Sequence, residues 1–178
     1  MKIIPALLFS LVLGASVLFA APASAAAPAK KKNWIAPTQK IYAQQLADNI
    51  LKLHPELISV TLQGTPPGAA QDIYTMFAGS FPERIGNVCD PDDVDVILKG
   101  ITILDPRWRR TNDAVKKFVI LTPLRDANGE NIGLLVLAYK NDGSYAKTDD
   151  AFYAAGMKLR LEIQSQIMSF AALFSPAH

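Results

Sequence analysis

The sequence predicts an α+β fold in which an antiparallel sheet is flanked by long N- and C-terminal helices. Residues 116–140 form two apolar runs around a polar turn that ends in Asn128-Gly129, a strong short-range signal for a β-hairpin. Residues 57–63 alternate between apolar and polar side chains, as strands do. Apolar residues recur at helical spacing in residues 38–53 and again from about residue 148.

The first residues are typical of a secretory signal peptide. Lys2 precedes an apolar run over residues 3–19, and the small residues after it supply a cleavage site following Ala25. The run is shorter than the roughly 20 residues that cross a bilayer, which disfavours a membrane anchor. Cys89 is the only cysteine, so no lipoprotein anchor is indicated. We expect residues 1–25 to be a removed signal peptide and the protein to be periplasmic or secreted.

The processed chain has room for one domain, since about 150 residues remain. We assign residues 26–37 to a flexible tail and residues 38–174 to the domain. Removing the leader removes one of 18 basic residues and none of the 16 acidic ones, so the net charge becomes +1. This balance implies no nucleic-acid partner, and the lysines at 30–32 are expected to be solvated. One cysteine forms no internal disulfide, so the fold depends on its apolar core.

The first predicted helix spans residues 38–53, with Thr38 as its cap and His54-Pro55 as its end. Its apolar stripe consists of Tyr42, Leu46, Ile50 and Leu53. The strand that follows, over residues 57–63, is expected to have one buried face. That face carries Ile58, Val60 and Leu62, and the other carries Ser59, Thr61 and Gln63.

The middle of the chain is rich in turn residues. Residues 65–68 predict a turn, and residues 72–78 fit either a strand or a short helix. Residues 79–86 contain too much glycine and proline for a regular element and are expected to form an ordered loop. Asp90 is expected to cap a helix that runs to about Lys99. The proline that follows Asp90 suits the first turn of a helix, and the glycine that follows Lys99 suits the end of one.

A strand at residues 101–104 and a polar connection over 105–113 precede the hairpin. The last helix is expected to run from about Thr148 to Phe174, because apolar residues repeat there at spacings of three and four. These are Phe152, Gly156, Leu159, Ile163, Ile167, Phe170 and Phe174. Met157, Leu161 and Met168 widen the apolar surface, and either the first helix or a second subunit is expected to cover this excess.

One motif in the predicted hairpin carries a family resemblance. Residues 123–134 read Pro-Leu-Arg-Asp-Ala-Asn-Gly-Glu-Asn-Ile-Gly-Leu, which is similar to the penultimate hairpin of PAS-type sensor domains of the extracytoplasmic Cache group. The order of the predicted elements resembles the same fold over about residues 38–172. Small secreted proteins with a PAS/Cache-like domain and little else also resemble this chain at residues 54–56, 65–67, 84–86 and 90–93. The resemblance implies an antiparallel sheet that binds a ligand.

In the fold that this chain resembles, the ligand lies between the sheet and the irregular segment that crosses it. Candidate ligand-binding residues are Arg84, Tyr74, Arg107, Trp108, Lys117 and Tyr139. Arg84 is the first choice, because a tight loop can hold its guanidinium for two parallel hydrogen bonds to a carboxylate. A role in a surface salt bridge explains Arg84 equally well. Tyr74 and Tyr139 either wall an apolar cavity or belong to the core. Arg107-Trp108 is only a fragment of the signature of amino-acid-binding Cache domains, so amino-acid recognition is not implied.

The sequence holds no hydrolase, metalloprotease or phosphate-loop motif. The acidic residues at 90–93 are better explained as a helix start than as cation ligands. A nucleophilic Cys89 with His54 as its base is the less favoured explanation of this cysteine. A small half-buried thiol without a catalytic role is the better one. We therefore expect no enzymatic activity, no metal and no cofactor.

These observations predict an exported single-domain small-molecule-binding protein of the sensor type. It would capture a small metabolite, anionic if Arg84 binds it, by closing residues 64–93 over it, and present it to a membrane receptor or sensor partner. The alternative is a non-enzymatic structural or interaction protein, whose pocket is filled by its own side chains and which forms a homodimer through its C-terminal helix. A buried arginine without a bound anion would favour the small-molecule-binding protein. A wide apolar strip on both terminal helices would favour the interaction protein.

Overall fold

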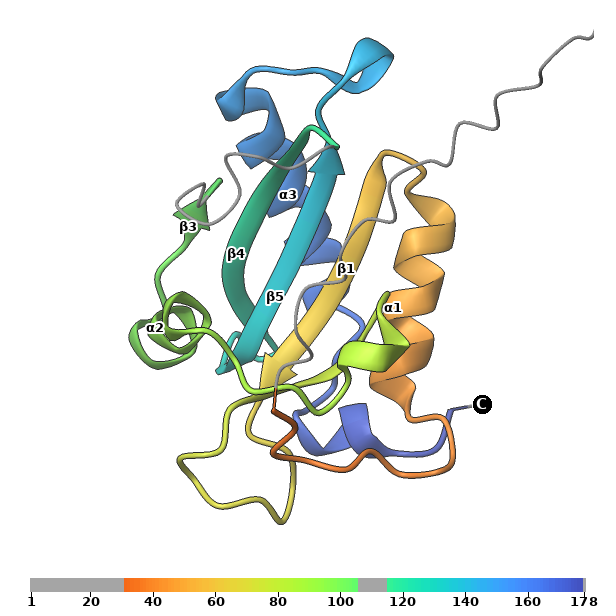
Figure 1. Ribbon diagram of the computed structural model, residues 1–178, viewed down its shortest axis with the longest axis vertical. Coiled ribbons are helices and arrows are strands. Elements are labelled where there is room, and N and C mark those ends of the chain that lie inside the picture. Colours follow the sequence, from red (N-terminus) through yellow and green to blue (C-terminus); the bar gives the residue numbers. More distant parts are fainter. Residues whose placement is uncertain (1–30, 106–114, 178) are drawn as a thin grey trace, which may run out of the picture.

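The sheet is antiparallel throughout, and its strands lie in the order β2-β1-β5-β4-β3 (Figure 1). The computed structural model describes residues 31–105 and 115–177, and within them the sheet has five strands. These are β1 Leu57–Gly64, β2 Thr75–Gly79, β3 Ile103–Leu104, β4 Lys117–Arg125 and β5 Asn131–Lys140. The α+β class and the antiparallel sheet are confirmed. Residues 72–78, for which a strand and a short helix were both open, contain most of β2. The predicted signal peptide lies outside the described residues.

The β4–β5 hairpin forms as predicted. Its turn is held by the buried carboxylate of Asp126, which accepts hydrogen bonds from the backbone N–H groups of Asn128 and Glu130 at 2.9 and 3.1 Å. Gly129 has a φ of 87°, a conformation that glycine adopts without steric cost. The turn residues therefore act locally, which is why the sequence alone predicts this hairpin.

Helices cover both faces of the sheet. α1 Tyr42–Leu53 and α3 Asp149–Gln164 lie on one face, and α2 Pro91–Lys99 lies on the other (Figure 1). α1 packs against β1 and β2, and α3 packs against β4 and β5. α2 packs against β4 and β5 from the opposite side. The described residues also contain three 3-10 turns, at Pro82–Arg84, Gly143–Tyr145 and Ala171–Phe174.

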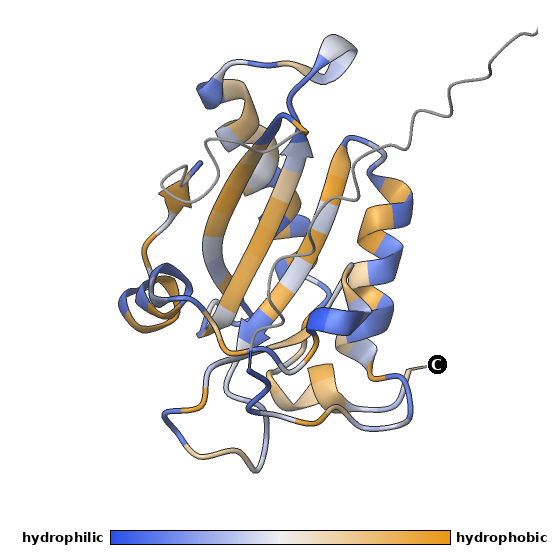
Figure 2. Cartoon of the chain, viewed as in Figure 1, coloured by the Kyte–Doolittle hydropathy of each residue, from blue (hydrophilic) through white to orange (hydrophobic). Residues whose placement is uncertain are grey.

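Most of the apolar core lies between the sheet and the layer formed by α1, α3 and the last 3-10 turn. Phe118 on β4 stacks on Phe152 on α3, with 4.8 Å between ring centres. A smaller cluster lies under α2 and includes Val96, Val119 and Leu121. Figure 2 shows β5 as hydrophobic along most of its length, as a strand buried on both faces requires.

Both terminal helices are shorter than the sequence predicts. α3 ends at Gln164 and not at Phe174, and the chain then folds into the 3-10 turn Ala171–Phe174. The apolar spacing continues past the helix because Phe170 and Phe174 still pack on Phe77 of β2. The spacing of apolar residues indicates which side chains are buried. Here an α-helix and a 3-10 turn, two different backbone conformations, bury side chains that follow the same spacing.

α1 begins at Tyr42 and does not use Thr38 as its cap. Its N-cap is Ile41, whose side chain has no hydrogen-bonding group. The C-terminal segment supplies a partner, because the backbone N–H of Tyr42 donates to the carbonyl of Ser175 at 2.8 Å and Ile41 pairs with Pro176. A tertiary contact therefore replaces the predicted local cap.

The start of α2 agrees with the prediction. Asp90 is its N-cap and forms a capping box with Asp93, whose carboxylate accepts the backbone N–H of Asp90 at 3.0 Å. The helix ends at Gly100, which has a φ of 65°. Residue 79 still belongs to β2, and the rest of the predicted loop over residues 79–86 is an ordered loop that contains the turn Pro82–Arg84.

The segment before α1 is not a free tail in its described part. Lys32 pairs with Asn87 in a short antiparallel bridge, and the N–H of Asn33 donates to the carbonyl of Gly86 at 2.9 Å. Trp34 packs edge-on against Phe174, with ring centres 6.3 Å apart. The prediction of a flexible tail over residues 26–37 is therefore wrong for residues 32–34, because the loop after β2 and the C-terminal turn hold them.

Candidate functional site

Arg84 faces solvent. It ends the turn Pro82–Arg84, and 58% of its side chain is exposed. Its guanidinium carbon lies 4.2 Å from the ring centre of Phe81, and its Nε lies 3.8 Å from Oε1 of Glu83. Both partners belong to the same loop. This arrangement matches the surface salt bridge of the sequence analysis rather than a rigid clamp for a carboxylate.

Tyr139 is a core residue. Its side chain is 1% exposed and packs at a tilt against Phe152, with 5.7 Å between ring centres. Burial raises the pKa of its hydroxyl well above the usual value, and the negative charges of Glu56 and Glu162 raise that pKa further. The position agrees with the core alternative for this residue, and not with a cavity wall.

Two further candidates, Tyr74 and Lys117, lie apart from one another. Tyr74 precedes β2 and is half-buried, whereas Lys117 begins β4. β1 and β5 separate those two strands in the sheet. Arg107 and Trp108 lie outside the described residues. The four described candidates do not gather around one cavity, and their roles in binding stay predictions.

A polar row on β1 is the feature that sequence reasoning missed. Ser59, Thr61 and Gln63 lie on the face of the sheet that carries α2, and they are only 7%, 8% and 8% exposed. The prediction that β1 buries one face is therefore wrong, because the side chains on both faces of this strand are buried. The alternation in residues 57–63 assigns these three side chains to one face. Nothing in the neighbouring sequence indicates that this face of β1 is covered in the folded protein.

Gln63 is the centre of this polar row. The thiol of Cys89 donates to its Oε1 at 2.9 Å, while its Nε2 lies 3.5 Å from Oγ1 of Thr61, at the limit of a hydrogen bond. A carboxamide offers two N–H donors and an oxygen with two lone pairs. With respect to the described residues, Gln63 therefore keeps hydrogen-bonding capacity in a place where unused capacity costs free energy.

The covered face is half apolar and half polar. α2 lies over β4 and β5, where Val119, Leu121 and Leu134 form an apolar patch. The polar row continues that surface on β1, because Gln63 pairs with Leu134 and Thr61 with Val136. Apolar walls with a few neutral hydrogen-bonding groups are typical of sites for small molecules.

An open hollow of about 600 Å³ lies between residues 32–35 and the loop after β1, which contributes Pro67 and Ile73. Asn33 lines it. The Nδ2 of Asn33 donates to the carbonyl of Tyr74 at 3.2 Å, whereas its buried Oδ1 has no hydrogen-bond partner among the described residues. The same carbonyl of Tyr74 accepts the N–H of Cys89 at 3.1 Å. One carbonyl group thus connects the hollow to Cys89 and, through its thiol, to Gln63.

Within residues 31–105 and 115–177, no three His, Cys, Asp or Glu side chains gather as a metal site would require. No helix in the same ranges combines the length and apolar character needed to cross a bilayer.

Comparison with known proteins places the chain in no family. No protein-family model matches it, and no curated protein does. One similar solved structure is the type II free methionine-R-sulfoxide reductase from Thermoplasma acidophilum, with 16% identity over 74% of this chain and 92% of that one and a TM-score of 0.42. Another is the C-terminal domain of the E. coli transcriptional regulator KdgR, with 14% identity over 72% and 97% and a TM-score of 0.42. At these TM-scores neither likeness carries a functional argument.

Proposed function

We propose that this protein is exported, has a PAS/Cache-like fold and binds a small molecule that it presents to a membrane partner. The polar row on β1 carries the proposal. The leader-like residues 1–25 and the antiparallel sheet with helices on both faces support it. A strand buried on both faces only to complete a core would carry apolar residues at positions 59, 61 and 63.

The row favours a ligand with neutral hydrogen-bonding groups. Its side chains are two hydroxyls and one carboxamide, none of which carries a charge. The expectation of an anionic ligand depended on Arg84, which faces solvent and pairs with Glu83. We therefore propose an uncharged amide or hydroxyl group as the part of the ligand that Gln63 binds.

The contact between Cys89 and Gln63 suggests how binding would change the surface. A thiol is a weak hydrogen-bond donor, so an N–H or O–H of a ligand would bind Oε1 of Gln63 more strongly. A ligand that replaces the thiol would displace Cys89 and with it the segment over residues 64–93. The exposed turn Pro82–Arg84 belongs to this segment, and a membrane partner would recognise its new position.

Native mass spectrometry of the protein, purified from its export compartment, tests this proposal. We expect the wild-type protein to carry a small-molecule adduct that Gln63→Leu loses. Gln71→Leu makes the same change on an exposed loop and is expected to keep the adduct. Arg84→Ala is also expected to keep it. An adduct lost from Arg84→Ala and kept by Gln63→Leu would contradict the proposed site, and a wild-type protein without any adduct would contradict ligand capture.

One observation favours the alternative of an interaction protein. Three large apolar side chains of the C-terminal part, Tyr153, Leu161 and Met168, are exposed. Such a surface is typical of contacts with another protein. The same mass spectra distinguish the two functions, because an adduct-free dimer would support the interaction protein.

A further inference from the structure

We propose that Asn128-Gly129 is a site of spontaneous deamidation that the turn of the β4–β5 hairpin keeps unreactive, and that Asp126 is the residue that protects it. This inference does not depend on ligand binding. Asn128 is the only asparagine in the sequence that a glycine follows, and it is exposed in the turn. The position therefore combines a sequence suited to this modification with access to the water that completes it.

Deamidation at Asn128 begins with an attack by the neighbouring backbone. The backbone nitrogen of Gly129 would form a bond to Cγ of Asn128, and the bond from Cγ to Nδ2 would break. The Nδ2 amide group would leave as ammonia, with the proton of the Gly129 N–H. Water then opens the five-membered imide to an aspartate or, with one more carbon in the main chain, to an isoaspartate. A glycine hinders this attack least, because it has no Cβ.

The conformation of the turn follows from its hydrogen bonds and backbone angles. The N–H of Gly129 donates to the carbonyl of Asp126 at 2.9 Å, which closes a four-residue turn with Ala127 and Asn128 at its centre. Turns of types II, I′ and II′ need a positive φ at a central residue, whereas Asp105 is the only non-glycine residue with a positive φ in the described ranges. The turn is therefore of type I, in which Asn128 has a φ of about −90° and a ψ of about 0°.

This conformation keeps the two reacting atoms apart. When ψ of Asn128 is near zero, the nitrogen of Gly129 is eclipsed with the backbone nitrogen of Asn128, and Cβ lies about 120° away around the Cα–C bond. The five-membered ring instead requires the nitrogen of Gly129 to be nearly eclipsed with Cβ. The peptide group between Asn128 and Gly129 must therefore rotate by about this angle before the attack. Such a rotation breaks the hydrogen bond from the N–H of Gly129 to Asp126.

The carboxylate of Asp126 opposes this rotation. Its Oδ1 accepts the N–H of Asn128 at 2.9 Å and the N–H of Glu130 at 3.1 Å. These two donors lie on either side of the Cα–C bond that must turn, so the rotation cannot keep both hydrogen bonds. Asp126 is only 6% exposed, and hydrogen bonds to a carboxylate are among the stronger ones in proteins. Asp126 therefore makes the reactive conformation of Asn128 rarer than the Asn-Gly sequence alone would make it.

Peptide mapping by mass spectrometry at mildly alkaline pH tests the protection, because it measures how fast Asn128 becomes an acid. We expect the folded wild-type protein to deamidate at least about tenfold more slowly than the same chain unfolded in urea. Folded Asp126→Ala is expected to deamidate at least about tenfold faster than the folded wild-type protein, because the rotation no longer breaks a hydrogen bond to a carboxylate. Gln44→Ala is the control and should keep the wild-type rate, because it removes two hydrogen bonds between α1 and Gly79 of β2, away from this turn.

Asp126→Ser is a second test that does not depend on the folding of the alanine variant. A serine hydroxyl accepts hydrogen bonds from the same backbone groups more weakly, so its rate is expected to lie between those of the folded wild-type protein and the unfolded chain. Circular dichroism verifies that each variant is folded. Equal rates in the folded and unfolded wild-type protein would overturn protection by the turn. Rates in the folded Asp126 variants no higher than that of Gln44→Ala would overturn the role of Asp126.

Discussion

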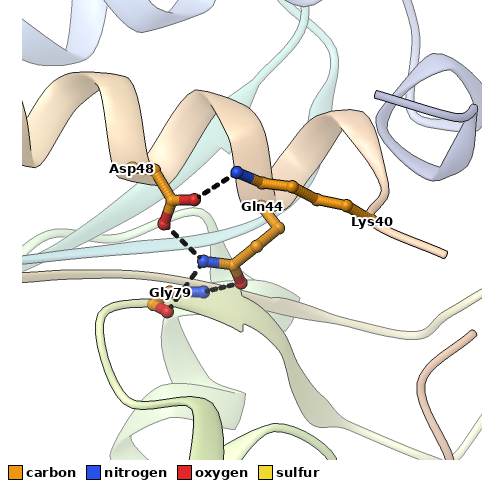
Figure 3. A network of polar contacts seen from close by, with 4 residues as sticks. All are labelled: Lys40, Gln44, Asp48 and Gly79. Carbon is orange, nitrogen blue, oxygen red and sulfur yellow. Dashed lines mark hydrogen bonds and ion pairs between the residues drawn. The ribbon is translucent and has the colours of Figure 1, made fainter. Parts of the chain in front are cut away.

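The side-chain amide of Gln44 forms two hydrogen bonds with the backbone of Gly79, one in each direction (Figure 3). Nε2 of Gln44 donates to the carbonyl of Gly79 at 3.0 Å, and the N–H of Gly79 donates to Oε1 at 3.0 Å. Nε2 also donates to Asp48, whose other carboxylate oxygen pairs with Lys40. One side chain on α1 therefore satisfies both backbone groups at the end of β2 and joins the helix to the sheet.

We predict that Gln44→Ala lowers the free energy of unfolding by about 2 kcal/mol, because two backbone groups that are shielded from water lose their partner. Urea denaturation followed by circular dichroism measures this change. Asn49→Ala removes an exposed amide from the same helix and is expected to change stability by less than about 0.5 kcal/mol. Equal effects of the two substitutions would mean that the contact with Gly79 is not stabilising.

Gly156 allows α3 to approach β4 closely. A Cβ atom at this position would lie 2.4 Å from Cδ1 of Ile120, which is closer than two carbon atoms can come. We predict that Gly156→Ala destabilises the protein by about 1 to 3 kcal/mol through overpacking. This result would oppose the gain of about 1 kcal/mol that alanine brings over glycine in an exposed helix.

Ile120→Val removes the clashing methyl group and provides the control for Gly156. Alone, it is expected to cost about 1 kcal/mol through the lost contacts. In the Ile120→Val background, Gly156→Ala should cost clearly less than in the wild-type protein, which a double-mutant cycle measures by urea denaturation. Additive effects would show that the two positions do not limit each other.

The buried hydroxyl of Tyr139 predicts a loss of stability at high pH. Its pKa is raised in the folded protein, by burial first and then by Glu56 and Glu162. The unfolded chain therefore loses this proton first, at about pH 10, and folding becomes less favourable as the pH rises further. The stabilising contribution is fully present below about pH 10. Tyr139→Phe should lose less stability than the wild-type protein above that pH, and parallel stability profiles would contradict this assignment.

Arg84 is expected to contribute little to stability. Its side chain is exposed and its pairing with Glu83 spans 3.8 Å, so Arg84→Ala should change the free energy of unfolding by no more than about 0.5 kcal/mol. Lys99→Ala is a fair comparison, because Lys99 pairs with Asp95 on an equally exposed surface. A much larger effect of Arg84→Ala in urea denaturation would show that Arg84 has a structural role beyond this loop.

Local chemistry determined several elements of this fold from the sequence alone. The hairpin follows from two apolar runs and from a turn in which Asp126 bonds to backbone groups only two and four residues away. The start of α2 follows from Asp90 and Asp93, which satisfy each other within one turn. Interactions of this kind join residues that are neighbours in the sequence, so a short sequence pattern is enough to predict them.

Only the tertiary structure decided which surfaces are covered and which side chains meet. The spacing of Phe170 and Phe174 indicates burial but not a helix, because their contact with Phe77 joins segments far apart in the chain. Alternation assigned Ser59, Thr61 and Gln63 to one face, but only the packing of the folded chain over the sheet buries that face. Arg84 and Tyr139 were chosen for their chemistry, and their positions at the surface and in the core depend on long-range packing. Burial is a property of the assembled sheet and helices, and no short stretch of sequence contains it.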